Sequence, residues 1–236
     1  MSSEGWVAGL KRPKPRSFQI AGTRRNVNPV RAPTADMDLT GLRRHTPKEV
    51  TRARREAAVL APVIERGGEA HLLFTKRAAH LGRHPGQMSF PGGGREPIDR
   101  TLTDTALREA DEEVGMRSDE VDVVGRLDDT RTSSAYRIRP FVGVAPDREY
   151  IPDESEVAEV AVLPVSGLSD PANYETERRI GHPEYGDHRI HFFHVDGYTV
   201  WGATGRMVVQ LLERTTDWRA PEEVDRVVGA DAELPI

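Results

Sequence analysis

The chain has 236 residues, enough for one sizeable domain with extensions, and 37% of them are hydrophobic. It contains no cysteine, which excludes disulfides, thiol nucleophiles and zinc–thiolate sites and fits a reducing cytoplasm. No stretch approaches the roughly 18 apolar residues of a membrane span, and no secretory signal peptide opens the chain, so we expect a cytoplasmic location.

Charge is unevenly distributed along the chain. Residues 1–36 carry a net charge of +5, whereas the remainder carries −10. An acidic body argues against a surface that coats nucleic acid. Residues 1–45 show no sustained hydrophobic period and contain four prolines among basic residues, which predicts a disordered basic N-terminal extension. Met37 is an alternative start of the chain.

Regular structure is expected from about Arg55 onward. The apolar run 57–64 predicts a strand, in which Pro62 indicates an edge position or a bulge. A glycine pair then makes a turn, and residues 71–76 predict the returning strand. Residues 82–94 follow as a loop punctuated by glycine and proline.

A helix is expected next. Thr101 or Thr103 can cap its N-terminus, the helix runs to about Val114, and Gly115 stands where a left-handed cap is common. Alternating apolar residues predict further strands at 121–127, 138–145, 157–163 and 189–195.

The last third of the chain completes one mixed α/β domain, expected over about residues 50–215. Residues 166–174 are a turn-rich connection, and a helix is predicted at about 201–214. The acidic residues 216–236 are expected to form a C-terminal tail, weakly helical near 222–228.

Three histidines on the last predicted strand suggest a metal site at first sight. His191 points to the opposite face of a strand from His188 and His194. A three-histidine site is therefore excluded, and we interpret these side chains as structural.

Three glutamates form one face of the first predicted helix. At about 100° per residue, Glu112 and Glu113 lie on either side of Glu109, next to a stripe of small residues that suits packing on a sheet. A solvated acidic face would show the same run, but Glu109 and Glu113 are like charges four residues apart with no nearby lysine. Carboxylates with open coordination positions suit Mg²⁺ or Mn²⁺, which bridge substrate phosphates.

This helix resembles a known family motif. Residues 108–116, READEEVGM, match the second half of the Nudix box, Arg-Glu-U-x-Glu-Glu-x-Gly-U, in which U is apolar. In the first half, counted from Gly93, the acidic position is Asp99 instead of glutamate, and one residue more than in the pattern separates it from Arg108. The resemblance implies an α/β/α fold, in which a mixed β-sheet is sandwiched between helices.

The residues before the box resemble the coenzyme A diphosphatase branch of the Nudix family. Its signature, Leu-Leu-Thr-x-Arg-(Ser/Ala)-x3-Arg-x3-Gly-x3-Phe-Pro-Gly-Gly, fits residues 73–93 with its spacing intact. Phe74 replaces one leucine, and Gly82 stands where arginine is expected, with Arg83 as the neighbouring candidate for that role.

The resemblance implies a reaction and a class of substrate. The expected reaction is metal-dependent hydrolysis of the diphosphate of coenzyme A or acyl-coenzyme A to adenosine 3′,5′-bisphosphate and (acyl-)4′-phosphopantetheine. Alternatives are a Nudix hydrolase of ADP-ribose, NADH or damaged nucleotides, and a non-catalytic nucleotide-binding module. The expected partner is a small nucleotide diphosphate, not a nucleic acid or a membrane, and a homodimer is left open.

The resemblance also implies roles for individual residues. Glu112 and Glu113 are expected to be the main ligands of Mg²⁺ or Mn²⁺, with Glu109 as a third ligand or as the base for the attacking water. The Gly93 carbonyl is expected to complete the metal shell, and Arg108 to tie down the glutamates. The candidate substrate contacts are Arg77, Arg83, His84 and Gln87. Glu156 is a candidate for an extra metal ligand.

Overall fold

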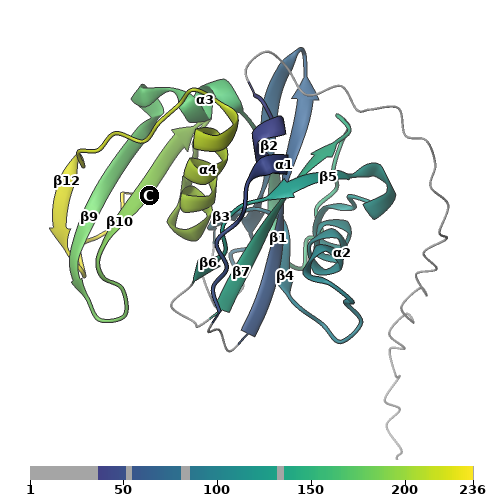
Figure 1. The fold of residues 1–236 in the computed structure, drawn as a ribbon, viewed down its shortest axis with the longest axis horizontal. Coiled ribbons are helices and arrows are strands. Elements are labelled where there is room, and N and C mark those ends of the chain that lie inside the picture. The colour runs from purple at the N-terminus through teal and green to yellow at the C-terminus, as the bar shows by residue number, and fades with distance from the viewer. Residues whose placement is uncertain (1–36, 52–54, 81–85, 132–135, 236) are drawn as a thin grey trace, which may run out of the picture.

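The computed structural model describes residues 37–51, 55–80, 86–131 and 136–235. Within these residues, eight strands build one mixed sheet and four build a second (Figure 1). The same part of the chain contains no helix with the length and apolar character needed to cross a membrane.

Strand β1 (Arg55–Arg66) is the centre of the first sheet. It runs parallel to β7 (Tyr136–Ala145) over ten residue pairs, and antiparallel to β2 (Glu69–Arg77) only at its C-terminal end. Two strands, β5 (Asp122–Arg126) and β6 (Thr130–Arg131), pair with β7. On the other side of the sheet, β8 (Val157–Pro164) pairs with β2. The predicted strands of this sheet are confirmed.

A glycine-rich segment fills the gap where β1 and β2 separate. β3 (Met88–Ser89) pairs with the end of β2, and β4 (Gly92–Gly94) pairs with the start of β1. The amide of Leu60 donates to the carbonyl of Pro91 at 2.8 Å. Pro62, two residues further, lies where β1 changes partner from β4 to β2, so its missing amide costs no ladder bond. The edge position predicted from Pro62 is therefore wrong, because β1 is paired on both sides.

Helices cover both faces of the first sheet. α2 (Leu102–Val114) packs on one face over a cluster that includes Leu60 and Leu73. α4 (Gly202–Thr215) covers the other face over a cluster that includes Phe74, with α1 (Thr40–Arg44) beside it. This arrangement confirms the predicted α/β/α fold class.

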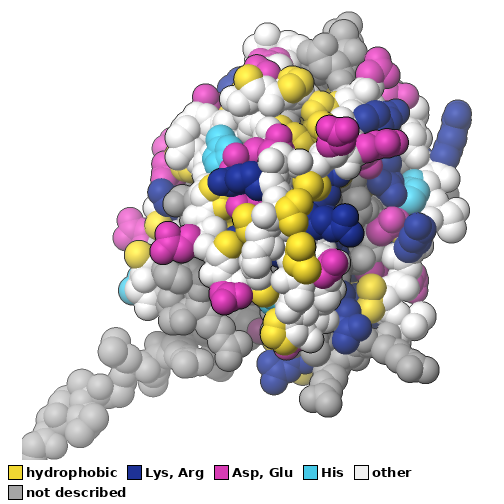
Figure 2. Space-filling model, turned by 90° about the vertical axis from the view of Figure 1, so that its left-hand side faces the viewer, with side chains coloured by type: hydrophobic (Ala, Val, Ile, Leu, Met, Phe, Trp, Pro, Cys, Tyr) yellow, Lys and Arg dark blue, Asp and Glu magenta, His cyan; other side chains and the backbone are white. Residues whose placement is uncertain are grey.

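A second sheet lies against the outer side of α4; the sequence predicted one of its strands, at 189–195, but not the sheet. Its strand order is β11 (Tyr198–Trp201), β10 (Gly186–Val195), β9 (Tyr174–His182) and β12 (Arg226–Gly229), with β12 parallel to β9. Short helical segments occur along the chain at η1 (Ser118–Glu120), α3 (Val165–Ser169) and η2 (Pro171–Asn173). Figure 2 looks at the side of the molecule on which β12 lies, where hydrophobic, acidic and basic side chains are interspersed.

The predicted N-terminal extension is folded at its end. Residues 37–45 belong to that extension, yet Met37, Leu39 and Leu42 are buried in the α4-side cluster. The amide of Asp38 also donates to the carbonyl of Thr215 at 2.6 Å. The predicted boundary at residue 45 is therefore too late, and residues 1–36 lie outside the described part of the chain.

The predicted C-terminal tail is joined to the second sheet. Instead of a weak helix near 222–228, the chain forms β12 alongside β9. Arg179 of β9 then donates hydrogen bonds to three carbonyls beyond β12, those of Ala230, Ala232 and Glu233. The predicted weak helix is wrong because the backbone of this segment is instead satisfied in an extended conformation, by pairing with β9 and by the hydrogen bonds from Arg179.

Candidate active site

Helix α2 begins and ends with the signals expected from the sequence. The hydroxyl of Thr101 accepts from the Asp104 amide at 3.2 Å, and the Asp104 carboxylate accepts from the Thr101 amide at 2.8 Å. Gly115 closes the helix in the left-handed conformation with φ of 66°. Ala106 and Ala110 are fully buried, which confirms the predicted small-residue face.

The glycine segment and its neighbours approach so closely that side chains would not fit. A Cβ on Gly92 would lie 2.4 Å from the carbonyl oxygen of Ala58, and its φ of 158° also disfavours a side chain. A Cβ on Gly93 would lie 2.6 Å from the carboxylate of Glu109. The Glu109 carboxylate therefore lies directly against the backbone of β4. The acidic face of α2 thus lies over the gap between β1 and β2 that β4 fills.

Glu113 carries a carboxylate that the protein does not satisfy. Its Oε2 is buried and has no hydrogen-bond partner in the described part of the chain. Burial and the nearby charge of Glu109 raise the pKa of Glu113 to about 8, with a further contribution from Glu156, although the Gly92 amide and Arg77 oppose the shift. A carboxylate in such surroundings is stabilised either by a proton or by a cation.

Glu109 shares this environment but has one strong partner. The Nη2 of Arg108 donates to its Oε1 at 3.0 Å. Burial raises the pKa of Glu109 against the opposing effect of Arg108, and the charges of Glu112 and Glu156 add to the increase. The charge of Glu156, which lies in another part of the chain, acts on both Glu109 and Glu113, so Glu156 lies on the side of α2 that carries these two glutamates.

Arg108 joins the helix to the preceding loop. Its Nε and Nη2 donate to the two carboxylate oxygens of Asp99 at 3.0 and 3.1 Å, and its Nη2 also donates to the Gly94 carbonyl at 3.1 Å. Asp99 is 6% exposed and also accepts from the Thr105 hydroxyl at 2.9 Å. Burial alone would raise the pKa of Asp99, but its hydrogen bonds from Arg108, the Glu96 amide and Thr105 together lower it, so this carboxylate stays charged.

Asp99 is the site residue whose role sequence reasoning missed. The signal was present, because Asp99 is the acidic residue in the first half of the box. The altered residue type and spacing did not reveal that Asp99 pairs with Arg108 through both carboxylate oxygens. Such a pair fixes the guanidinium plane, and with it the direction in which Arg108 holds Glu109.

Glu112 is more exposed than the other two glutamates of the box. Its side chain is 60% exposed and accepts from the Nη1 of Arg108 at 2.7 Å, four residues earlier on the helix. Arg108 therefore holds Glu109 and Glu112 at once. Its expected task of tying down the glutamates remains a prediction, but it has a geometric basis in these contacts.

The other expected site residues divide into two groups. Arg77 and Glu156 lie close enough to Glu113 to influence its pKa in opposite directions. The Gln87 carbonyl accepts from the Arg77 amide at 3.0 Å, while the Gln87 side chain lies beside Gly202 at the start of α4. Arg83 and His84 lie outside the described residues.

The donor set fits a hard divalent cation, although the ligands are not gathered in a finished shell. Within the described ranges, no three His, Cys, Asp or Glu side chains form a group ready to hold a metal ion. The fit rests on the buried, partnerless Oε2 of Glu113 and on the like-charged Glu109 near it. Carboxylates are the ligands that Mg²⁺ and Mn²⁺ prefer, and a cation would remove the repulsion between them.

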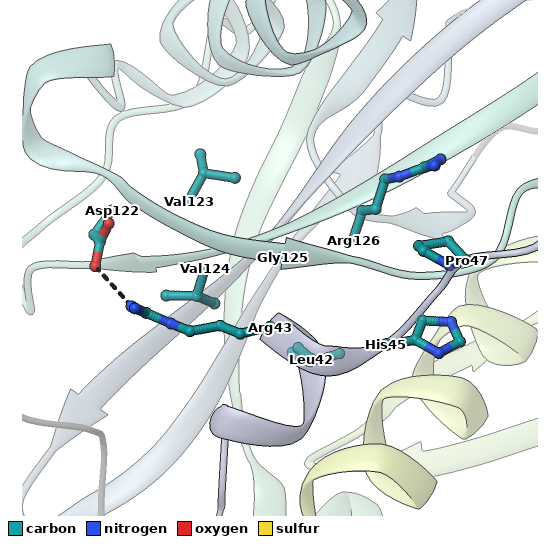
Figure 3. Close-up of a pocket in the computed structure, with 9 residues that line it drawn as sticks. All are labelled: Leu42, Arg43, His45, Pro47, Asp122, Val123, Val124, Gly125 and Arg126. Atoms are coloured by element: carbon teal, nitrogen blue, oxygen red, sulfur yellow. Dashed lines mark ion pairs between the residues drawn. The ribbon is translucent and has the colours of Figure 1, made fainter.

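A surface hollow elsewhere contains none of the expected site residues. A cavity of about 430 Å³ lies between α1 and β5, lined in part by Leu42, Arg43 and Val124 (Figure 3). Leu42 and Val124 belong to the cluster on the α4 side of the sheet, whereas the glutamates lie on the α2 side. Arg43 and Asp122 form an ion pair across its rim at 3.8 Å.

Comparison with known proteins identifies the family. The model of the NUDIX domain matches residues 54–184. An uncharacterized Nudix hydrolase, NudL, of Enterobacter sp. (strain 638) is 39% identical over 162 residues, which cover 67% of this chain and 81% of the relative. NudL of Yersinia pestis (strain Pestoides F) is 36% identical over 163 residues, or 69% and 80% of the two chains.

A solved structure shows a weaker likeness. A MutT/nudix family protein from Enterococcus faecalis has a TM-score of 0.45 at 15% identity, covering 75% of this chain and 67% of that one. The domain match and the two relatives show that the chain belongs to the Nudix hydrolase family. The resemblance seen in the box is thus confirmed, while neither relative's name states a substrate.

Proposed function

We propose that the protein hydrolyses the diphosphate of coenzyme A or acyl-coenzyme A, releasing adenosine 3′,5′-bisphosphate and (acyl-)4′-phosphopantetheine. The observation that carries the reaction type is the buried Oε2 of Glu113, which lacks a hydrogen-bond partner and belongs to a carboxylate near Glu109. The substrate is supported by the sequence of residues 73–93, whose spacing resembles the coenzyme A diphosphatase branch.

Mg²⁺ or Mn²⁺ is the cofactor that this donor set suits. Glu109, Glu112 and Glu113 would hold the cation, with the Gly93 carbonyl and Glu156 as further ligands. When bound, the cation neutralises charge on the diphosphate and polarises the attacking water.

The protein's own residues orient the reactants and move one proton. Water attacks one phosphorus, the bond from that phosphorus to the bridging oxygen breaks, and the oxygen leaves with the electron pair. Glu109 is the base that takes the proton of the water. Arg108 holds the Glu109 carboxylate in place, and Arg77 brings positive charge to the side where the diphosphate binds.

Product analysis tests both the reaction and the substrate. The full chain is incubated with Mn²⁺ and, separately, coenzyme A, ADP-ribose or NADH, and the products are identified by mass spectrometry. We expect coenzyme A to be cut at its diphosphate. Coenzyme A that survives while another compound is cleaved would refute the substrate, and survival of all three would refute the hydrolysis. Glu113→Gln is the control and should be almost inactive.

A further inference from the structure

Arg95, the first residue after β4, connects the start of the central strand to the loop before α2. Its Nη1 donates to Oε2 of Glu56 on β1 at 3.0 Å. Its Nη2 donates to the carbonyls of Asp99 and Arg100 at 3.4 and 3.1 Å. Its backbone amide donates to the Glu56 carbonyl at 3.0 Å, which extends the pairing of β4 with β1 by one residue. One guanidinium therefore fixes the loop against the sheet.

The carbonyls that Arg95 holds belong to Asp99 and to the residue that follows it, Arg100. The Asp99 carboxylate accepts from Arg108, and Arg108 in turn holds Glu109 and Glu112. The placement of a carboxylate on a loop depends on the placement of the loop. Hydrogen bonds to the Asp99 carbonyl and to the next carbonyl along the loop limit how the backbone at Asp99 moves, and so limit where Arg108 can lie.

The sequence of this loop gives Arg95 a particular task. Asp99 has a shorter side chain than the glutamate of the box pattern, and one additional residue separates it from Arg108. Both differences demand a defined loop path if the carboxylate is to reach the guanidinium. A turn in which the Glu96 amide donates to Asp99 Oδ2 at 2.8 Å supplies part of that path.

Glu56 is itself held from a second strand. It forms an ion pair with Arg137 of β7 in addition to the pair with Arg95. The strand that Arg137 belongs to pairs with β1 over its full length up to Ile64. The anchor of Arg95 is therefore itself held by a residue of the neighbouring strand.

We propose that Arg95, anchored by Glu56, is a positioning residue that fixes the Asp99 loop so that Asp99 and Arg108 hold the box glutamates in register. The proposal rests on the proposed function only in taking these glutamates as the catalytic group. Glu56 holds Arg95, Arg95 holds the loop that carries Asp99, and Asp99 holds Arg108.

Two measurements on the full chain test the proposal. The first compares kcat and KM for coenzyme A with Mn²⁺ in wild type and Arg95→Ala, where we expect kcat to fall about 10- to 100-fold with KM within about twofold. The second follows the Nε–Hε NMR signal of Arg108 without metal or substrate, assigned by its loss in Arg108→Lys. We expect this signal to shift or broaden in Arg95→Ala, because its hydrogen bond to Asp99 is no longer held in one geometry.

Arg66→Ala is the matched control. Arg66 is the last residue of β1, the strand that carries Glu56, and it pairs with Asp147 at 2.8 Å. Its side chain is 45% exposed, compared with 39% for Arg95. This variant should leave kcat and the Arg108 signal unchanged. Arg95→Lys keeps a positive charge near Glu56 but lacks the planar guanidinium that donates to several acceptors at once. Its melting temperature should therefore match that of wild type, while its kcat should stay as low as in Arg95→Ala.

The outcomes separate this proposal from the proposed function. Arg95→Ala that matches Arg66→Ala in both kcat and the Arg108 signal would overturn the positioning role, as would full recovery of kcat by lysine. The NMR measurement needs no turnover. Wild-type protein that does not cleave coenzyme A would therefore refute the proposed function alone, and the Arg108 signal would still decide the role of Arg95.

Discussion

Two glutamates with buried carboxylate oxygens, Glu113 on α2 and Glu177 in the second sheet, have opposite surroundings. Glu177 of β9 is 2% exposed and accepts from Arg179 at 3.0 Å, with Arg226 of β12 at 3.0 Å on its other oxygen. Glu113 has a buried oxygen without a partner and carboxylates as neighbours. Burying a charge is unfavourable unless it is paired, so the protein pairs Glu177 with arginines but gives the buried oxygen of Glu113 no such partner.

Under the proposed function, Glu177 is a structural carboxylate and Glu113 a cation ligand. The Glu177 cluster joins β9 to β12, and Arg179 extends it to the carbonyls of the following segment. Every charge in it has an opposite charge within reach. At the α2 site, Arg108 pairs with Glu109 and Glu112, whereas Glu113 lies near the like charges of Glu109 and Glu156, as our proposed cation site requires.

The largest expected effect is on the reaction rate of Glu113→Gln. Glutamine keeps the shape of the side chain but removes the charge that would hold the cation. We expect kcat for coenzyme A to fall by at least about 100-fold, measured at saturating Mn²⁺. Glu177→Gln is the comparison variant and should retain kcat within about twofold. Equal losses in the two variants would show that the contrast has no functional meaning.

The free energy of unfolding should rank the two variants in the opposite order, with Glu177→Gln the more strongly affected. Glu177→Gln leaves Arg179 and Arg226 without their buried carboxylate, and breaking such a pair costs about 3 kcal/mol. Glu113→Gln removes like-charge repulsion and should not destabilise the metal-free protein at pH 8. Urea unfolding with a chelator present measures both. A destabilised Glu113→Gln with an unaffected Glu177→Gln would reverse the assignment.

The charge at Glu113 also predicts how stability depends on pH. In the folded, metal-free protein its pKa is about 8, against an ordinary value of 4.5, so the folded state binds more protons than the unfolded state between these values. Unfolding free energy should therefore fall as pH rises through this range. Between pH 6 and 9, wild type should lose about 2 kcal/mol more than Glu113→Gln. Parallel curves for the two proteins would contradict the raised pKa.

Asp99→Asn should have a smaller effect on rate. Asparagine is similar in size but cannot give Arg108 two charged acceptors, so Glu109 and Glu112 lose part of their support. We expect kcat to fall about 10- to 100-fold with little change in KM. Steady-state kinetics at several Mn²⁺ concentrations measure this. A variant whose loss is cured entirely by more Mn²⁺ would point to metal affinity and not to positioning.

Much of the first sheet and its helices was predictable because local signals agreed with the fold. The Thr101 and Gly115 caps and the alanine stripe define α2 with no need for distant contacts. Strands such as β7 and β8 carry apolar residues because their faces are buried by helices. The identities of the box glutamates were equally predictable, because they follow from spacing along one helix.

The second sheet was hidden by its own chemistry. β9 has a polar sequence because Glu177 and Arg179 are buried as an ion pair whose other partners lie on β12 and in the segment after it, which no local pattern shows. β12 is four residues long within an acidic stretch, and its pairing with β9 spans about 50 residues of chain. Contacts at such separation determine these strands, so propensity alone does not reveal them.

The unequal environments of the site glutamates were also beyond the sequence. Spacing placed Glu109, Glu112 and Glu113 on one face, but it did not show that Glu112 is exposed while an oxygen of Glu113 is buried. That difference arises from the glycine segment, which comes so close that only backbone fits between β1 and α2. Burial of this kind depends on three-dimensional packing, and it is what separates a surface charge from a cation site.

The most direct test of the contrast between the two glutamates is Mn²⁺ binding without substrate. Electron paramagnetic resonance of free Mn²⁺ is followed while metal-free wild type, Glu113→Gln or Glu177→Gln is added, at pH 6.5 and pH 8.5. We predict saturable binding by wild type and Glu177→Gln that tightens as pH rises, because the cation displaces the proton of Glu113, and almost none by Glu113→Gln. Equal, pH-independent binding by wild type and Glu113→Gln would contradict the account.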